Sequence, residues 1–168
     1  MYHIFLSTTS IYICYKFGDW KNWQKYYSTI LFFILSSVVC LVLTYNHPLW
    51  LYESKILNRT FSDLLISITV YPSTVMIFIP NFPRKISKII IYISSYVAIY
   101  TIIELISNKL GYFTYHNNWN IWCTIIFNYI MFPMSILHYR KPLVAWIIAL
   151  ISPHILFFIL KIPYSTIR

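Results

Sequence analysis

The chain has 168 residues, of which 59% are hydrophobic, 20% are aromatic and only 10% are charged. A soluble domain usually has about a quarter of its residues charged, so this composition excludes a soluble protein and predicts an all-α, polytopic transmembrane bundle surrounded by the lipid bilayer. The formal net charge of +9 does not indicate nucleic-acid binding, because the Lys and Arg residues are scattered between apolar stretches without a basic cluster or a binding motif.

The first apolar stretch, residues 2–17, is short for a transmembrane helix. At about 1.5 Å per residue it measures about 24 Å, whereas a hydrocarbon core is about 30 Å thick. A helical stripe opposite its apolar face carries His3, Ser7, Ser10 and Cys14, which favours a span over a re-entrant or surface segment. We therefore expect about six helices arranged as hairpins in a single integral membrane domain, residues 1–168, or five helices if residues 1–15 do not cross.

An aromatic turn and a polar loop flank the second expected span, residues 27–45. In the turn, Gly18 can end a helix and Asp19 can cap the next one, and the Trp, Tyr and Lys residues around them are typical of the membrane interface. After the span, Pro48 and the amphipathic pattern that follows it predict a short helix lying in the interface over residues 46–62.

The third expected span, residues 63–80, contains Pro72 near its middle. A proline inside a helix frees a backbone carbonyl, so we expect a kink there. A short basic turn follows at residues 81–85.

The fourth expected span, residues 86–108, has polar side chains four residues apart. They are Tyr92, Tyr96, Tyr100, Glu104 and Asn108. This spacing places side chains on one ridge of a helix, and we expect the ridge to face the interior of the bundle. The polar loop after it, residues 109–118, contains turn-forming Gly and Asn residues.

Two further spans are expected at residues 119–137 and 142–160. The first begins with Trp119 and Trp122, which we interpret as an interfacial pair. Asn120, Thr124 and Asn128 follow at four-residue spacing on one face of that helix. The tail, residues 161–168, is short and polar.

Lys and Arg residues predict the orientation of the bundle. The three short turns, residues 16–26, 81–88 and 138–142, contain eight of the 13, and the two longer loops and the tail contain five. Because Lys and Arg accumulate in cytoplasmic loops, we expect a multi-pass protein of the cell membrane with the short turns in the cytoplasm.

Six residues are candidates for ligand binding. They are Glu104, Tyr100, Tyr96, Asn128, Asp63 and His154. A carboxylate inside a span costs about 3 kcal/mol at the helix centre on insertion scales, so Glu104 is expected to face protein or water. In the expected topology, Asp63 and Asn120 lie at the same depth near the outer face, and the other polar candidates lie deeper.

Two interpretations of these residues remain open. In the first, they line an outward-facing polar cleft in which Glu104 binds a cation or an amine, or relays a proton. In the second, Glu104 pairs with Lys109 or Arg59, and the tyrosines and Asn128 form hydrogen bonds between helices. In measured membrane proteins such a hydrogen bond contributes on average about 0.6 kcal/mol to stability.

Motifs of the common enzyme and cofactor sites are missing from the sequence. There is no nucleophile elbow, glycine-rich phosphate loop or metal-binding His pair, so we predict no catalytic residue, metal or cofactor, and an enzyme is not favoured. A membrane enzyme built from Glu104, Asp63 and His154 is the remaining alternative. The three cysteines are far apart in apolar runs, which is typical of buried thiols.

Five segments taken in order, GDWKNWQKYY, NHPLW, YPSTVMIFIP, the WN-x-W pair at Trp119–Trp122 and MFPMSILHYRKP, resemble a family of small integral membrane proteins of spore-forming Bacillus- and Clostridium-type bacteria. The family has no assigned activity, and the resemblance implies a bacterial cytoplasmic membrane and no functional residues. The favoured hypothesis is therefore a structural or accessory component of the cell or spore membrane, with a membrane-protein partner. The alternative is a binder or permease of a small solute, ion or lipid component, with a cleft around Glu104.

Overall fold

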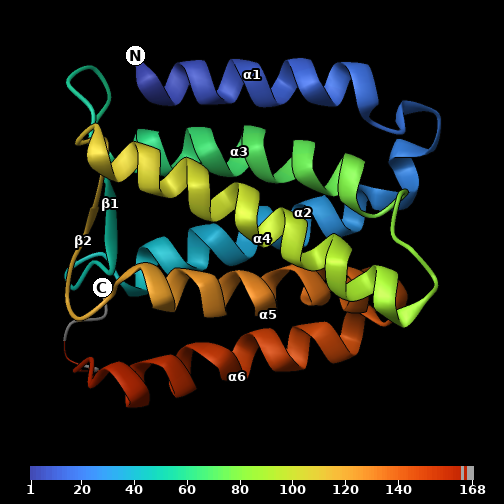
Figure 1. Cartoon of the computed structure of the whole chain (residues 1–168). Coiled ribbons are helices and arrows are strands. Elements are labelled where there is room, and N and C mark those ends of the chain that lie inside the picture. The colour runs from blue at the N-terminus through green and yellow to red at the C-terminus, as the bar shows by residue number, and fades with distance from the viewer. Residues whose placement is uncertain (164, 166–168) are drawn as a thin grey trace.

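The computed structural model describes residues 1–163 and 165 of the chain. These residues form six α-helices, one short 3-10 helix and a two-stranded sheet (Figure 1). In chain order the elements are α1 (Tyr2–Phe17), η1 (Trp20–Asn22), α2 (Trp23–Leu43), β1 (Trp50–Tyr52), α3 (Arg59–Phe78), α4 (Ile86–Lys109), β2 (Phe113–Tyr115), α5 (Ile121–Arg140) and α6 (Pro142–Leu160). The prediction of an all-α bundle with six helices is confirmed.

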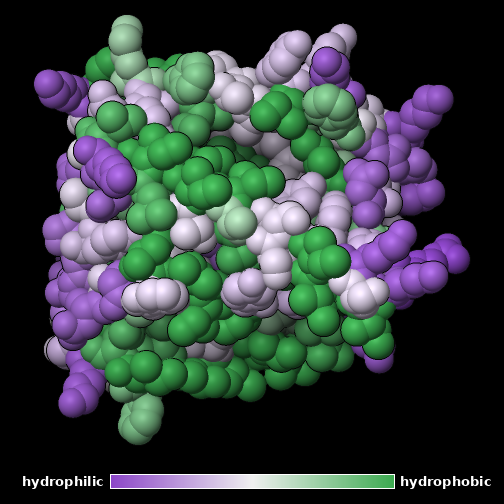
Figure 2. Space-filling view, in the orientation of Figure 1, coloured by the Kyte–Doolittle hydropathy of each residue, from purple (hydrophilic) through white to green (hydrophobic). Residues whose placement is uncertain are grey.

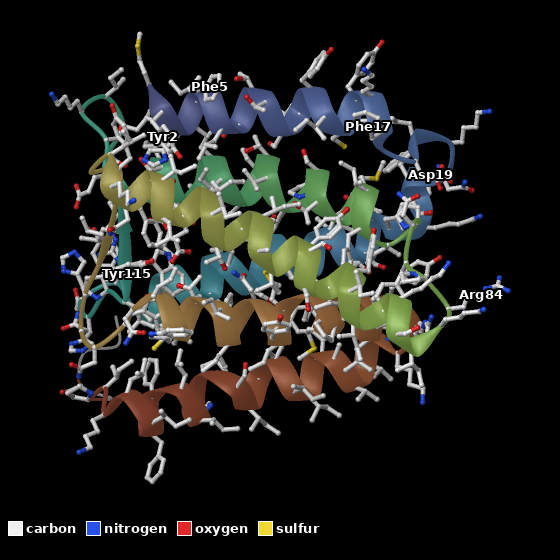
Figure 3. All side chains as sticks on the ribbon, viewed as in Figure 1. Tyr2, Phe5, Phe17, Asp19, Arg84 and Tyr115 are labelled. Atoms are coloured by element: carbon white, nitrogen blue, oxygen red, sulfur yellow. The ribbon has the colours of Figure 1, made fainter. Side chains whose placement is uncertain are left out.

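All six helices run along one common direction, so the molecule has two ends (Figure 1). We call the end with β1 and β2 the sheet end, and the end with the three short turns the basic end. In Figure 3, Tyr2 and Tyr115 lie at the sheet end, whereas Asp19 and Arg84 lie at the basic end. Figure 2 shows hydrophilic residues gathered at these two ends and hydrophobic residues across the width between them, the pattern of a surface that faces a bilayer.

Five of the helices are long and apolar enough to cross a membrane, namely α2 (together with η1), α3, α4, α5 and α6. The short α1 is not among them, but it lies lengthwise along the bundle like the others (Figure 1). This helix has 16 residues and ends at Phe17, with Gly18 as its C-cap. The protein is therefore a multi-pass membrane bundle with five candidate spans, and α1 runs along the bundle beside them.

The helices pack in a different order from their order in the chain. α1 packs on α3, α2 packs on α3 and α5, α4 packs on α5, and α6 packs on α5. Two of the three predicted hairpins are thus open, because α1 and α2, and likewise α3 and α4, have their main contacts elsewhere. The result is an open ring in the order α1, α3, α2, α5, α4, with its ends at α1 and α4.

Buried apolar side chains form two separate clusters. The larger one surrounds Phe78 and Phe132, towards the basic end, and we call it the aromatic core; Val75, Met76, Val97 and Ile136 also belong to it. The smaller one lies at the sheet end and consists of Leu49, Trp119, Phe157 and Ile162.

The predicted interfacial helix over residues 46–62 is wrong. Instead, β1 pairs with β2 in antiparallel register, with Trp50 opposite Tyr115. Both segments are short runs of aromatic, Leu and Thr residues, and aromatic and β-branched residues favour extended structure. The pairing also satisfies backbone groups that a loop over the membrane would leave open. The sequence pattern of one loop could not reveal a partner strand 60 residues away.

Two local predictions have different outcomes. Gly111, Asn117 and Asn118 have φ angles of 73°, 49° and 67°, so they are turn residues as predicted. By contrast, Trp119 is not one of an interfacial pair: it is only 6% exposed, whereas Trp122 is 71% exposed. The indole of Trp119 turns inwards and donates a hydrogen bond of 3.0 Å to the Thr124 hydroxyl.

Candidate functional site

A cavity of about 440 Å³ lies inside the open ring of helices. Its walls come from α1, α3, α4 and α5, and side chains of β1 and β2 line it at the sheet end. Most of the lining is apolar. Its polar members include Glu104, Asn128, Tyr96, Tyr100, Thr124 and Ser107. Four of the six predicted ligand-binding residues therefore line one space, although they come from two helices.

Glu104 is half-buried near the sheet end of α4, and its hydrogen-bond partners are Tyr115 and Thr124. The Tyr115 hydroxyl of β2 donates a hydrogen bond of 2.7 Å to Glu104 Oε1. Burial, together with this contact to Glu104, raises the pKa of Tyr115 far above its usual range, so the hydroxyl keeps its proton and remains a donor. The sheet thus fixes the position of the carboxylate.

The expected pairing of Glu104 with Lys109 or Arg59 is not what holds the carboxylate. Lys109 is exposed. Arg59 turns towards the end of α2, where its Nη1 donates a hydrogen bond of 2.7 Å to the carbonyl oxygen of Tyr45 and its guanidinium lies over the Tyr45 ring. A cation therefore does not neutralise Glu104 in the way that the second interpretation required.

Asn128, on α5, is the most unusual polar group of the cavity. It is only 4% exposed and lines the cavity. No hydrogen bond to another of the described residues gives its side chain the interhelical role that the second interpretation assigned to it. Its amide is also not among the inaccessible unpaired side-chain groups of the described residues, which are those of His3, Ser36, Arg59, Ser62 and Thr101. The amide therefore reaches the space of the cavity, where a molecule can contact it.

The tyrosines of α4 agree with the second interpretation. The Tyr100 hydroxyl is hydrogen-bonded to the Thr74 hydroxyl of α3. Tyr92 donates a hydrogen bond of 3.1 Å to the carbonyl oxygen of Phe78, and Tyr96 packs edge-on against the Phe78 ring. The predicted ridge therefore faces the interior of the bundle, and its tyrosines hold α4 against α3. Tyr96 and Tyr100 also line the cavity.

Asp63 and His154 do not line this cavity. Asp63 lies in the first turns of α3, where its main charged neighbour is Arg59. His154 lies on the exposed face of α6, with its Nδ1 3.2 Å from the carbonyl oxygen of Leu150. The structure therefore does not bring Glu104, Asp63 and His154 together around one cavity, as the membrane-enzyme alternative required.

Asn120, expected beside Glu104, has a different position. It is the N-cap of α5, and its side-chain oxygen accepts hydrogen bonds from the backbone of Trp122 and Cys123. Its type and its place just before an apolar run are the signals of a capping residue. The part of the chain that is described also contains no group of three or more His, Cys, Asp or Glu side chains that could hold a metal ion.

Sequence reasoning missed the contribution of three elements to the site. Tyr115 of β2 holds Glu104, and Tyr52 of β1 and Thr9 and Ser10 of α1 line the cavity. Ser10 belongs to the stripe recognised in the sequence, which could have indicated that α1 faces the cavity. Tyr52 and Tyr115 gave no such signal, because tyrosine in an outer loop is typical of any interfacial segment.

Comparison with known proteins adds no relative: no family model, no curated protein and no solved structure matches the chain. The cavity itself is therefore the basis for inferring a function.

Proposed function

We propose that this multi-pass membrane protein binds a small amphipathic ligand in the cavity, with Glu104 and Asn128 holding the polar group of the ligand. The observation that carries the proposal is a cavity of about 440 Å³ that has Glu104 and Asn128 in its otherwise largely apolar lining. Ligand pockets typically measure about 300–1,000 Å³.

The chemistry of the lining indicates which polar group fits. A carboxylate only accepts hydrogen bonds, whereas an amide both donates and accepts. Glu104 already has Tyr115, which donates to its Oε1, and Thr124 as hydrogen-bond partners. A carboxylate can accept about four hydrogen bonds, so a further donor from the ligand can still bind it. An amine, preferably cationic, or a hydroxyl meets this requirement, and the apolar walls formed by residues such as Ile66 and Val70 suit a hydrocarbon part.

The test uses three probes with the same alkyl chain, octylamine, octanol and octanoate, added to the purified protein in detergent. We expect octylamine to raise the unfolding temperature most and octanoate least. Glu104→Gln and Asn128→Leu should each weaken octylamine binding by roughly 10- to 100-fold, because a hydrogen bond to a charged group contributes about 1.5–3 kcal/mol.

Asp63→Asn is the matched control, since it removes a half-buried carboxylate of α3 that does not line the cavity. It should bind octylamine as the unchanged protein does, with the same partitioning of the probe into micelles. Equal stabilisation by the three probes, or equal losses for Glu104→Gln and Asp63→Asn, would refute the proposal.

A structural or accessory role in the cell or spore membrane is the second candidate from the sequence. The cavity favours a binding protein over it, because an accessory subunit needs no internal space lined by a carboxylate and an amide. Absence of probe binding, together with recovery of one defined partner after gentle extraction, would favour the accessory role.

We also propose that the basic end faces the cytoplasm. Arg84 in the turn between α3 and α4 lies there (Figure 3), as do the other Lys and Arg residues of the short turns, and such residues accumulate on the cytoplasmic side. Arg168, which was counted for the opposite side, lies outside the described residues. Modification of single cysteines introduced at Arg84 and at Lys55 by an impermeant reagent in intact cells tests this orientation: the second should react and the first should not.

A further inference from the structure

Side chains of β1 and β2 line the cavity at the sheet end. The cavity also opens through the side of the bundle. We propose that its ligand is a membrane lipid, one apolar chain of which enters from the bilayer through a window between α1 and α4. This inference rests on the proposed function, because it assigns the class of ligand for the same cavity.

The packing order creates the window. α1 packs on α3 and α4 packs on α5, so the two ends of the open ring are not packed along each other. Figure 2 shows a hollow on the face towards the viewer, in the space that Figure 1 places between α1 and α4. Ile13 of α1 and Ile99 and Ile103 of α4 line the cavity and are also exposed on the outside of the bundle. Such a surface is covered by lipid chains.

Side-chain contacts close the window at the sheet end. There the Tyr2 hydroxyl of α1 is hydrogen-bonded to the Ser107 hydroxyl of α4 at 2.7 Å, and the Tyr2 ring stacks on Tyr112 at 4.8 Å. Towards the basic end, Tyr92 of α4 stacks on Phe78 of α3 at 5.1 Å, so α4 contacts the helix on which α1 packs. The opening is thus separated from the sheet end and lies along the apolar part of the bundle, where the molecule meets hydrocarbon.

The cavity is long enough for one lipid chain. On α3 alone the lining extends from Ile66 to Ile77, which corresponds to about 16 Å of helix, and half of a hydrocarbon core is about 15 Å. Glu104 and Ser107 lie towards the sheet end of α4, whereas Ile77 lies one residue before the basic end of α3. A lipid of the leaflet at the sheet end would thus place its head near Glu104, with room for its chain to reach past the middle of the membrane.

A water-soluble solute is less suited to this space. Trp50 of β1 and Phe113 of β2 line the sheet end of the cavity, so apolar side chains stand between its interior and the aqueous side there. The lateral window, in contrast, connects it to lipid without a polar barrier.

Fluorescence quenching by brominated lipid tests the inference. Trp119 lines the cavity and is only 6% exposed, so lipid around the protein barely reaches it. A variant that retains Trp119 and has Phe at the other five tryptophans is reconstituted in phosphatidylcholine with or without bromine on its chains. We expect bromine to quench Trp119, and Thr9→Phe in the same background to remove the quenching, because Thr9 lines the cavity on the α1 side.

Thr8→Phe is the matched control, as Thr8 is the exposed neighbour of Thr9 and does not line the cavity; quenching should persist. Ile103→Phe against Ile102→Phe repeats the comparison on α4, where only Ile103 lines the cavity, and serves if Thr9→Phe fails to fold.

The outcomes separate this inference from the proposed function. Octylamine binding that depends on Glu104 and Asn128, without quenching of Trp119, overturns lipid entry and leaves the binding site standing. Quenching that persists equally in Thr9→Phe and Thr8→Phe also overturns the window. Quenching that Thr9→Phe removes but Glu104→Gln and Asn128→Leu leave unchanged supports lipid entry and overturns the polar site.

Discussion

The basic half and the sheet half of the bundle differ in how completely they are packed. In the basic half, Phe78 and Phe132 are 1% and 2% exposed, and the void beside them is about 10 Å³, about the minimum needed to hold a single water. Towards the sheet end the same helices surround about 440 Å³, although on α3 this space extends to Ile77, beside the aromatic core. The spans are therefore able to pack closely, and they separate only around the cavity.

Polar groups show the same difference. In the basic half, Thr29 and His138 are both buried and lie 3.0 Å apart as a hydrogen-bonded pair. In the sheet half, buried side-chain atoms of His3, Ser62 and Thr101 have no hydrogen-bond partner among the described residues. Polar groups are therefore less completely paired in the half that contains most of the cavity.

The largest expected effect is that of Phe132→Ala in the aromatic core. Phe132 contacts Phe78 and Tyr100 at ring distances of 5.0 and 5.3 Å, and truncation of such a ring costs about 3–5 kcal/mol of unfolding free energy. Phe127→Ala should cost much less, since Phe127 lines the existing cavity and is 41% exposed. Unfolding in mixed micelles measures both, and equal losses would contradict the difference between the two halves.

Removing a buried polar group should have opposite consequences in the two halves. Thr29→Val leaves the His138 ring nitrogen without its partner and should lower the unfolding free energy by about 1–3 kcal/mol. Asn128→Leu, without ligand, should leave it unchanged or raise it, because an unpaired amide is replaced by an apolar group of similar size. A comparable loss in both variants would mean that Asn128 has a structural partner.

The smallest effect concerns the pH dependence at the basic end. The Tyr26 hydroxyl donates a hydrogen bond of 2.7 Å to Asp19 Oδ2 and the Asn22 amide donates a second, and these donors lower the pKa of Asp19 below its usual value. Because the pKa of Asp19 is lower in the folded state, its carboxylate contributes to the free energy of unfolding above about pH 4. This contribution is lost as the pH falls through the folded pKa.

The unfolding temperature of the unchanged protein should therefore fall on acidification more than that of Asp19→Asn. Scans from roughly pH 6 to pH 3 measure this difference. Glu53→Gln, which removes an exposed acid at the sheet end, provides the comparison. Parallel curves for the unchanged protein and Asp19→Asn would show that the contact with Tyr26 contributes nothing to stability.

The sequence by itself determined the membrane class, the six helices and the inward face of α4. Each of these depends on local properties, namely the hydropathy of a stretch and the periodicity of a helix, which neighbours in the chain establish together. The four-residue spacing of Tyr92, Tyr96 and Tyr100 could be recognised in this way, as could the turn residues Gly111, Asn117 and Asn118.

Only the tertiary structure decided which helices are neighbours and where the space lies. The strand pairing of Trp50 with Tyr115, the contact of Tyr115 with Glu104 and the separation of Asp63 from the cavity all join or separate residues far apart in the chain. Such pairings depend on how apolar spans pack, and in lipid all apolar faces are alike until side chains meet. The sequence could therefore identify Glu104 and Asn128 as candidate binding residues, but only the packing of the helices brought both into the lining of one cavity.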